Sequence, residues 1–440
     1  MLRRKIGRVI AVAALLCAGV FAHAQDGAYS GYTPYSIFGL GQILNQGSAY
    51  NKTMGGVGVA TRDRRHINYL NPAAITARDS LAFMADFSLQ ESNTIFRQGD
   101  KYSANNLFNI NDIVISFPIE SHSAMAVGIV PYSATGYSYG AILKDPSIIG
   151  YTGDSGYTAT GQGSMYKLFA QAGVTFWKRL SLGVEGIYYF GNISKEYNQF
   201  FTSKGYGSID SGFDMTLNAQ SAKFGIQYEQ PFGGGKALTI GATYTMGANL
   251  KGYVNDYCFA TGTAQTDTLR SNIDTLALRS DKVRLASELG VGISFRSGEK
   301  WRAEVNYLRS DWSATNMDRA RGFAVSGSSV FSATTSESIR AGFEIVPNRN
   351  DIRYYYKRIA YRAGAYYEKA NYLLDGYGVN AYGVTLGATL PIFRAHNGLT
   401  LGMDIGRRGS IANNLVRETY VNFSVGFNMF DIWFRKPTYE

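Results

Sequence analysis

Residues 382–390 read Tyr-Gly-Val-Thr-Leu-Gly-Ala-Thr-Leu, so large apolar side chains alternate with Gly and Thr. This alternation has the period of a β-strand, whose successive side chains point to opposite faces. Residues 238–246 and 421–429 alternate in the same way. Each predicted strand therefore has one apolar face and one small or polar face. A small polar face fits the lumen of a membrane barrel better than the packed apolar core of a β-sandwich.

Such segments recur along the whole chain. We count about fourteen, an even number within the range of bacterial membrane barrels. They begin near Ser80, Asn109, Ser123, Ser164, Leu180, Asp214, Lys236, Lys282, Lys300, Glu337, Lys357, Gly378, Gly398 and Glu418.

The connections between these segments alternate in length. Those after odd-numbered segments are long, at residues 91–108, 133–163, 192–213, 252–281 and 310–336. Those after even-numbered segments are mostly short, at residues 120–122, 178–179, 231–235 and 297–299. Outer-membrane barrels combine long surface loops with short periplasmic turns, whereas a soluble sandwich has no reason to do so. The sequence thus predicts an all-β protein, a transmembrane antiparallel β-barrel of about fourteen strands.

The first residues predict export. A basic start is followed by an apolar stretch, residues 9–20, that is too short to span a bilayer. Ala22-His23-Ala24 then matches a signal-peptidase site, so residues 1–24 are the predicted signal peptide. A lipid on Cys17 is the alternative, but Leu16 stands where a lipoprotein signal needs Gly or Ala. The predicted location is the outer membrane of a Gram-negative bacterium.

Composition narrows the class of protein further. The chain has 50 Gly, 32 Tyr and 25 Phe but only 9 Pro. No apolar run after the predicted signal reaches the ~20 residues that a membrane helix needs. The formal net charge of +10 is not gathered into a stripe of Lys and Arg with interleaved aromatic residues, so no nucleic-acid partner is expected.

Residues 25–79 differ from the rest because they are rich in Gly, Asn and Tyr and do not alternate. Within them, residues 54–60 read Met-Gly-Gly-Val-Gly-Val-Ala, which indicates a compact, turn-rich packing element. No following Lys-Ser/Thr supports a phosphate-binding loop. We predict a plug at residues 25–79 and a barrel at residues 80–440.

Three stretches of this region resemble the N-terminal hatch of FadL-type outer-membrane transporters (FadL and TodX). They are Ile37-Phe38-Gly39-Leu40-Gly41, the Gly-rich stretch 54–60, and Asn71-Pro72-Ala73. The ending Asp431-Ile432-Trp433-Phe434-Arg435-Lys436 resembles FadL-like barrels of Bacteroidota. The resemblance implies a hatch inside a fourteen-stranded barrel, and hydrophobic compounds that leave sideways through a gap at a kinked strand. It marks the plug residues as Gly55, Gly56, Gly58, Asn71, Pro72 and Ala73.

The third predicted strand contains Pro131, followed by Gly136. Proline removes a hydrogen-bond donor from the ladder and is confined to edges, strand ends or bulges. One interpretation is a distortion that opens the barrel wall at Pro131 and Gly136. The other is simply the extracellular end of the strand.

Several ionisable residues fall on the inward face of the predicted strands. Facing lipid, the basic ones would each cost about 2–4 kcal/mol near the bilayer midplane. They are either cross-strand pairs that hold the plug and stiffen the wall, or a polar path for solutes. Arg62, Arg64 and Arg65 of the plug are available to meet such acids. The predicted lumen charges are Glu288, Arg302, Glu304, Arg340, Glu344 and Arg362, together with Glu185, Arg284, Glu368 and Asp404.

Neither catalysis nor metal binding finds support in the sequence. After the predicted signal the chain has only His66, His122 and His396, and none has the spacing of a zinc site or of a hydrolase. We therefore expect no enzyme activity, no catalytic residues, no cofactor and no metal.

Two functions remain open. The first is a FadL-like, porin-like transporter that moves hydrophobic or amphiphilic small molecules, including lipids, across the outer membrane. The second is a non-transporting barrel subunit of an outer-membrane complex, in type IX secretion or as an accessory of barrel assembly. The expected partners are outer-membrane lipid and lipopolysaccharide, hydrophobic small molecules, and other outer-membrane proteins.

Overall fold

The computed structural model describes residues 30–78, 82–144, 155–201, 207–261, 266–274, 282–324, 330–392 and 397–432. The predicted signal peptide and residues 433–436 of the terminal aromatic motif lie outside these ranges, as does His396.

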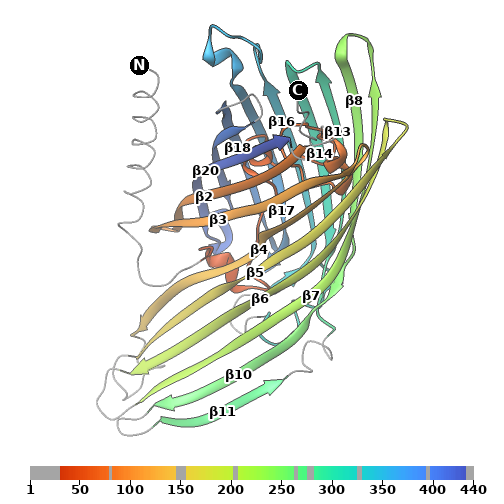
Figure 1. The fold of residues 1–440 in the computed structure, drawn as a ribbon. Helices are drawn as coiled ribbons and strands as arrows, with labels where there is room; N and C mark the ends of the chain where they lie inside the picture. Colours follow the sequence, from red (N-terminus) through yellow and green to blue (C-terminus); the bar gives the residue numbers. More distant parts are fainter. Residues whose placement is uncertain are drawn as a thin grey trace.

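Within the described residues, fourteen antiparallel strands close into one barrel, as predicted (Figure 1). The ring closes where the last strand pairs with the first, from Ala82↔Ile432 to Arg97↔Arg417. The barrel strands are β2 (Ala82–Gln98), β3 (Lys101–Glu120), β4 (Ser123–Leu143), β5 (Ser155–Phe176), β6 (Leu180–Phe201), β7 (Ser208–Pro231), β8 (Lys236–Thr245), β13 (Ser287–Ser297), β14 (Trp301–Asp311), β16 (Thr335–Ile345), β17 (Ala360–Leu374), β18 (Tyr377–Pro391), β19 (Gly398–Arg408) and β20 (Arg417–Ile432).

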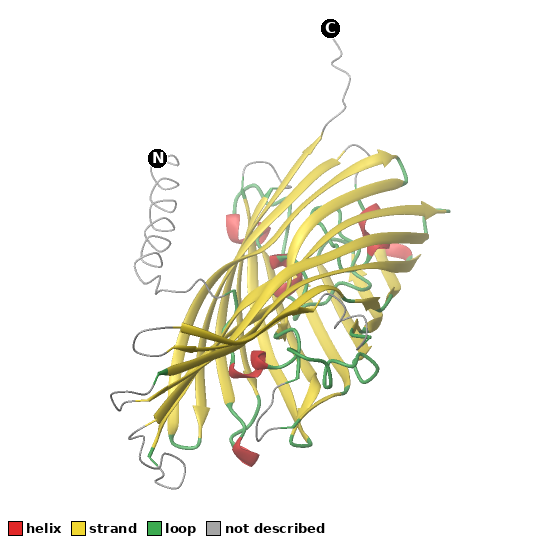
Figure 2. Ribbon diagram, turned by 90° about the horizontal axis from the view of Figure 1, so that it is seen from below, coloured by secondary structure: helices red, strands yellow, loops and turns green. Residues whose placement is uncertain are grey.

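The remaining elements are short (Figure 2). Among the described helices, none is long and apolar enough to cross a membrane. The short strands are β1 (Gln42–Ile43), β9 (Ala248–Asn249), β10 (Lys251–Thr261), β11 (Thr266–Asp274), β12 (Arg284–Leu285) and β15 (Phe331–Ala333). The helices are α2 (Ala49–Lys52) and the 3₁₀ turns η2 (Pro34–Ile37), η3 (Pro72–Thr76), η4 (Gly233–Gly235), η5 (Tyr355–Arg358) and η6 (Ala412–Asn414).

The two faces of the strands are as the alternation predicts. On β18, the apolar side chains of Val384 and Leu386 are 54% and 50% exposed on the outside of the barrel. Thr385, which lies between them, is 3% exposed because it faces the filled lumen. The apolar face is thus a lipid-facing surface and the polar face an interior one.

Four of the long connections, at residues 91–108, 133–163, 192–213 and 252–281, were predicted wrongly in extent, since much of each is strand. Residues 91–108 form the tip of a β2–β3 hairpin that turns at Gly99-Asp100. The strands β4 to β7 also run on far beyond the ring, and β10 and β11 extend their sheet (Figure 1). Near Asn105 and Asn106 of β3, and near Lys195 and Glu196 of β6, polar side chains occupy both faces, so the apolar period that marks a membrane strand is lost. The short turns lie where predicted.

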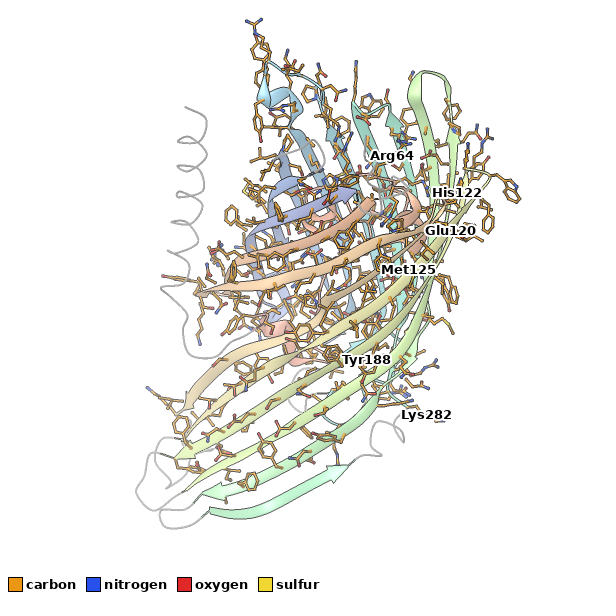
Figure 3. All side chains as sticks on the ribbon, in the orientation of Figure 1. Arg64, Glu120, His122, Met125, Tyr188 and Lys282 are labelled. Carbon is orange, nitrogen blue, oxygen red and sulfur yellow. The ribbon has the colours of Figure 1, made fainter. Side chains whose placement is uncertain are left out.

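The two ends of the barrel differ accordingly. Figure 3 places Glu120 and His122, at the short β3–β4 turn, well apart from Lys282, which follows the long connection after β11. The exposed side chain of Tyr188 lies on the wall between these heights.

We predict that Leu386→Arg destabilises the barrel by about 2–4 kcal/mol, because it places a charge in lipid near the middle of β18. Urea titration of the barrel in phospholipid vesicles measures this change. The control is Tyr377→Arg, at an equally exposed position next to the β17–β18 turn. Equal effects of the two substitutions would contradict a lipid-facing wall at Leu386.

Candidate functional site

Residues 30–78, here called the N-terminal segment, pack against the inward faces of strands on several sides of the barrel (Figures 1 and 2). Glycines on those faces let the backbones approach. A Cβ added to Gly364 on β17 would lie 2.2 Å from the Gly55 nitrogen, and one on Gly241 of β8 would lie 2.2 Å from the Val59 oxygen. The small inward residues are therefore the space that the segment fills.

The glycines Gly55, Gly56 and Gly58 lie where there is no room for a side chain. Gly55 and Gly56 have φ of +72° and +80°, which L side chains rarely adopt. A Cβ on Gly55 would lie 2.6 Å from the Ala341 oxygen, and one on Gly58 would lie 2.6 Å from Leu70 Cδ1.

Asn71, Pro72 and Ala73 form the start of η3 inside the barrel. The Asn71 Oδ1 accepts a hydrogen bond from the Ala73 nitrogen at 3.0 Å, and its Nδ2 donates to the Val59 oxygen at 2.7 Å. A Cβ on Gly225 of β7 would lie 2.1 Å from Asn71 Oδ1. The turn thus lies directly against β7.

Buried charges join the N-terminal segment to the wall. Arg302 on β14 forms an ion pair with Asp63 at 3.1 Å and donates to the Arg62 oxygen at 2.9 Å. Burial alone would raise the pKa of Asp63, but Arg302 and His66 outweigh it and hold that pKa well below its usual range. Glu304 accepts from the Ala60 nitrogen at 3.0 Å.

Four of the other predicted lumen charges form two ion pairs. Glu344 and Arg362 pair at 2.7 Å, Arg340 pairs with Glu368 at 3.0 Å, and Glu288 lies half-buried on β13. Arg284 on β12 is exposed, contrary to the prediction, because β12 lies outside the ring. Arg62 and Arg65 also contact other acids than the predicted lumen acids. Arg62 lies 3.9 Å from Glu229, and Arg65 lies 3.2 Å from Glu299.

The wall itself opens between β3 and β4. Their ladder runs from Glu120↔Ser123 to Ile113↔Ile129 and ends there, although both strands continue. Each strand carries a bulge directly beyond this point. The extra residues are Asn111 on β3, opposite β2, and Tyr132 on β4, opposite β5. Bulges bend a strand and increase its twist, so two facing bulges turn these strands apart.

Pro131 lies at the β4 bulge, a place in a sheet that tolerates proline. The N-terminal segment then takes the position on β4 that β3 leaves. Gln42 and Ile43 of β1 pair with Ala134 and Ser133. Farther along, the Thr33 nitrogen donates to the Gly136 oxygen at 2.8 Å. The two residues predicted for a lateral opening thus flank this region.

A cavity of about 590 Å³ lies at the opening. On the lumen side its lining is polar, and it includes Lys52, Gln90, Asn109, Asp404 and Asn422. On the membrane side it is lined by Ile110, Ile113, Ile129 and Tyr166. Ile110 and Ile113 are 53% and 41% exposed on the outer surface. The cavity therefore connects the lumen with the outside of the wall.

Lys52 is the cation at the centre of this lining, and the sequence did not mark it. Its Nζ donates to Gln90 Oε1 at 2.5 Å and to Asn111 Oδ1. Burial lowers the pKa of Lys52 to about 8, although Asp112 and Asp404 act to raise it. The amine is therefore mostly protonated at neutral pH.

The lumen is filled on the long-connection side. Residues 312–324 fold inward there, with Trp312, Met317 and Phe323 buried. The Gly39 nitrogen donates to the Phe323 oxygen at 2.9 Å, and Phe38 stacks on Phe331 with ring centroids 5.1 Å apart. Lys195 Nζ donates to the Gly322 oxygen at 2.8 Å. This cover was not expected, since residues 310–336 were interpreted as a surface loop.

Two of the three histidines discussed above lie within the described residues. His66 pairs with Asp63 at 3.2 Å, and His122 lies at an exposed turn beside Ser121. Within the described ranges, no group of three or more His, Cys, Asp or Glu side chains could hold a metal ion.

Comparison with known proteins gives the family. A family model described as BamG matches residues 4–440. The chain belongs to the BamG family. No curated protein sequence matches it.

The BamG-family chain also has the fold of several solved transporters. The Ralstonia pickettii toluene transporter TbuX has 13% identity and a TM-score of 0.58, covering 88% of this chain and 98% of its own. The Pseudomonas putida toluene transporter TodX has 11% identity and a TM-score of 0.58, and the match covers 89% of this chain and 100% of TodX. A Pseudomonas aeruginosa FadL homologue has 11% identity and a TM-score of 0.56, and the match covers 89% of this chain and 99% of the homologue. The predicted FadL-type fold is confirmed, and at these identities the likeness concerns the fold alone.

We predict that Gly364→Ala loosens the N-terminal segment, because the new methyl group would meet Gly55 and overpacking costs about 1–3 kcal/mol. Limited trypsin digestion of the purified barrel measures cleavage at Arg62 to Arg65, which should be several-fold faster. The control is Gly186→Ala, whose added Cβ has its nearest neighbour 4.0 Å away. Unchanged cleavage in Gly364→Ala would show that the segment does not depend on this contact.

Proposed function

We propose that this BamG-family barrel moves hydrophobic or amphiphilic small molecules across the outer membrane, and that they pass between bilayer and lumen through the opening between β3 and β4. The observation that carries the proposal is the end of the ladder at Ile113↔Ile129. A cavity of about 590 Å³ lies directly beyond that pair of residues.

The filled side of the lumen supports a lateral route. Residues 312–324 and the N-terminal segment pack together on the long-connection side. A solute entering along the barrel axis from there would have to displace this packing. A solute in the bilayer would meet apolar residues, Ile110 and Ile113, and then a polar interior.

The polar interior favours amphiphiles over plain hydrocarbons. The two transporters TbuX and TodX are named for toluene, a molecule without polar groups. Here Lys52, Asp404 and several amide side chains line the inner part of the cavity. A bound hydrocarbon would displace water from these charged groups without offering them an opposite charge, which disfavours it.

In this proposal residues 25–79 act as a plug that closes the lumen below the cavity. The ion pair of Arg302 with Asp63 and the seat of Asn71 on Gly225 hold the plug to the wall. Signal-peptide removal after Ala24 and an orientation with the short turns in the periplasm complete the arrangement.

Asn109→Trp tests the route, because Asn109 lines the cavity and its Nδ2 donates to the Ser30 oxygen at 2.7 Å. The indole would fill part of the opening, so we expect several-fold slower entry of a hydrophobic fluorescent dye into cells or vesicles that contain the barrel. The control is Ile119→Trp, an exposed residue on the same strand near the short turn. Equal uptake by both variants, with normal heat-modifiable gel mobility, would argue against the lateral route.

A second candidate is a subunit of an outer-membrane complex, and the sheet extension favours it. Beyond the ring, the outward face of β6 and β7 carries polar groups such as Glu196, Asp210 and Asp214. Such a face is unsuited to lipid and leaves a broad polar surface that a protein partner could cover.

A photo-crosslinking residue at Glu196 tests this second candidate in intact cells. A complex subunit should give one discrete protein adduct from this position. The same photo-crosslinking residue at Leu182, which is 40% exposed near the start of β6, should give lipid adducts only. No protein adduct from Glu196 would remove the support for a partner on this surface.

A further inference from the structure

The charges of the cavity at the wall opening are not all neutralised by the protein. Arg340 and Arg408 line it, and each has an ion-pair partner, Glu368 at 3.0 Å and Glu418 at 3.3 Å. Lys52 instead binds two neutral amides, Gln90 and Asn111. Within the part of the chain that the structure describes, it is the cation of this lining without an ion pair.

Among the described residues, the same lining also contains an anion without an ion pair, Asp404. Asp404 on β19 accepts hydrogen bonds from the Tyr366 hydroxyl at 2.9 Å and from Asn422 Nδ2 at 3.2 Å. Both donors are neutral, and no described basic group forms an ion pair with Asp404. Lys52 and Asp404 are near enough to influence each other electrostatically, yet they do not join in an ion pair. The cavity thus presents one positive and one negative group to whatever occupies it.

The outer part of the cavity, as far as the structure describes it, carries no charged group. Ile110, Ile113, Ile129 and Tyr166 line it, and Ile110 and Ile113 are exposed on the lipid-facing surface. A ligand that satisfies the whole site is therefore charged with both signs at one end and apolar at the other. Its apolar end would leave through the wall, into the bilayer.

We propose that this cavity binds the headgroup of a zwitterionic membrane phospholipid, with the phosphate at Lys52, the ammonium group at Asp404, and the acyl chains outside the wall beside Ile110 and Ile113. Phosphate accepts strong, charge-assisted hydrogen bonds from an ammonium group, and a carboxylate accepts them from the lipid amine. A phosphatidylglycerol headgroup would place neutral glycerol hydroxyls, instead of an ammonium group, beside Asp404. The proposal uses the same opening as the proposed function but does not require transport.

Native mass spectrometry of the purified, full-length mature protein tests the site. The probes are phosphatidylethanolamine and phosphatidylglycerol with identical acyl chains, added in equal amounts to the detergent-solubilised barrel. We expect the wild type to retain one phosphatidylethanolamine in preference to phosphatidylglycerol. Lys52→Gln should reduce the retention of phosphatidylethanolamine roughly ten-fold, because the phosphate loses one charge-assisted hydrogen bond. Asp404→Asn should reduce the preference for phosphatidylethanolamine over phosphatidylglycerol by a similar factor, because only the former carries an ammonium group.

Two further variants keep the test decisive. Lys52→Arg preserves the positive charge and should keep much of the retention of phosphatidylethanolamine. Lys300→Gln removes an exposed lysine at the short β13–β14 turn, far from the cavity lining, and should change nothing. Heat-modifiable gel mobility shows whether each variant has folded, and only folded variants are compared.

The outcomes separate this proposal from the proposed function. No preference in the wild type, a preference for phosphatidylglycerol or lipopolysaccharide, or equal losses in Lys52→Gln and Lys300→Gln would overturn the lipid site. Dye uptake is measured on the same variants. A retained lipid without any dye uptake would count against transport alone, and dye uptake without a retained lipid would count against the lipid site alone.

Discussion

A backbone N–H or C=O group inside a bilayer has no water to bind, so each one must find its partner within the protein. The ring of fourteen strands satisfies this constraint by closing β20 on β2. The same constraint explains the structure at the point where the β3–β4 ladder ends. Beyond Ile113↔Ile129, β3 leaves β4, and β1 of the N-terminal segment takes up the exposed edge of β4. The segment is therefore part of the wall as well as its filling.

The same constraint explains why so much of the fold could be predicted. Lipid on one side and a filled lumen on the other impose a period of two, and β18 shows it residue by residue, from Tyr382 to Thr389. Where the strands leave the membrane, their outer face no longer has to be apolar. The β2–β3 hairpin carries polar residues on both faces near Asn105 and Asn106, so its strands could not be told from a loop.

The candidate site was predictable only at its edges. Pro131 marked the distorted strand because its ring cannot donate to a ladder, and Asn71-Pro72 marked the seat of the segment. Lys52 carried no such signal, since its surroundings come from strands separated from it by tens to hundreds of residues, such as β3 and β19. The partners of Arg62 and Arg65 depend on the same long-range registers, which composition does not encode.

The position of the N-terminal segment has a consequence for the order in which the molecule is built. The segment leaves the ribosome first and the closing strand β20 leaves it last. In the finished protein, Thr53 lies against Gly387 and Gly402, and Ala49 lies against Gly426 of β20. The contact of Ala49 joins the N-terminal segment to the last described strand of the chain, so it can form only once β20 has taken its place in the ring.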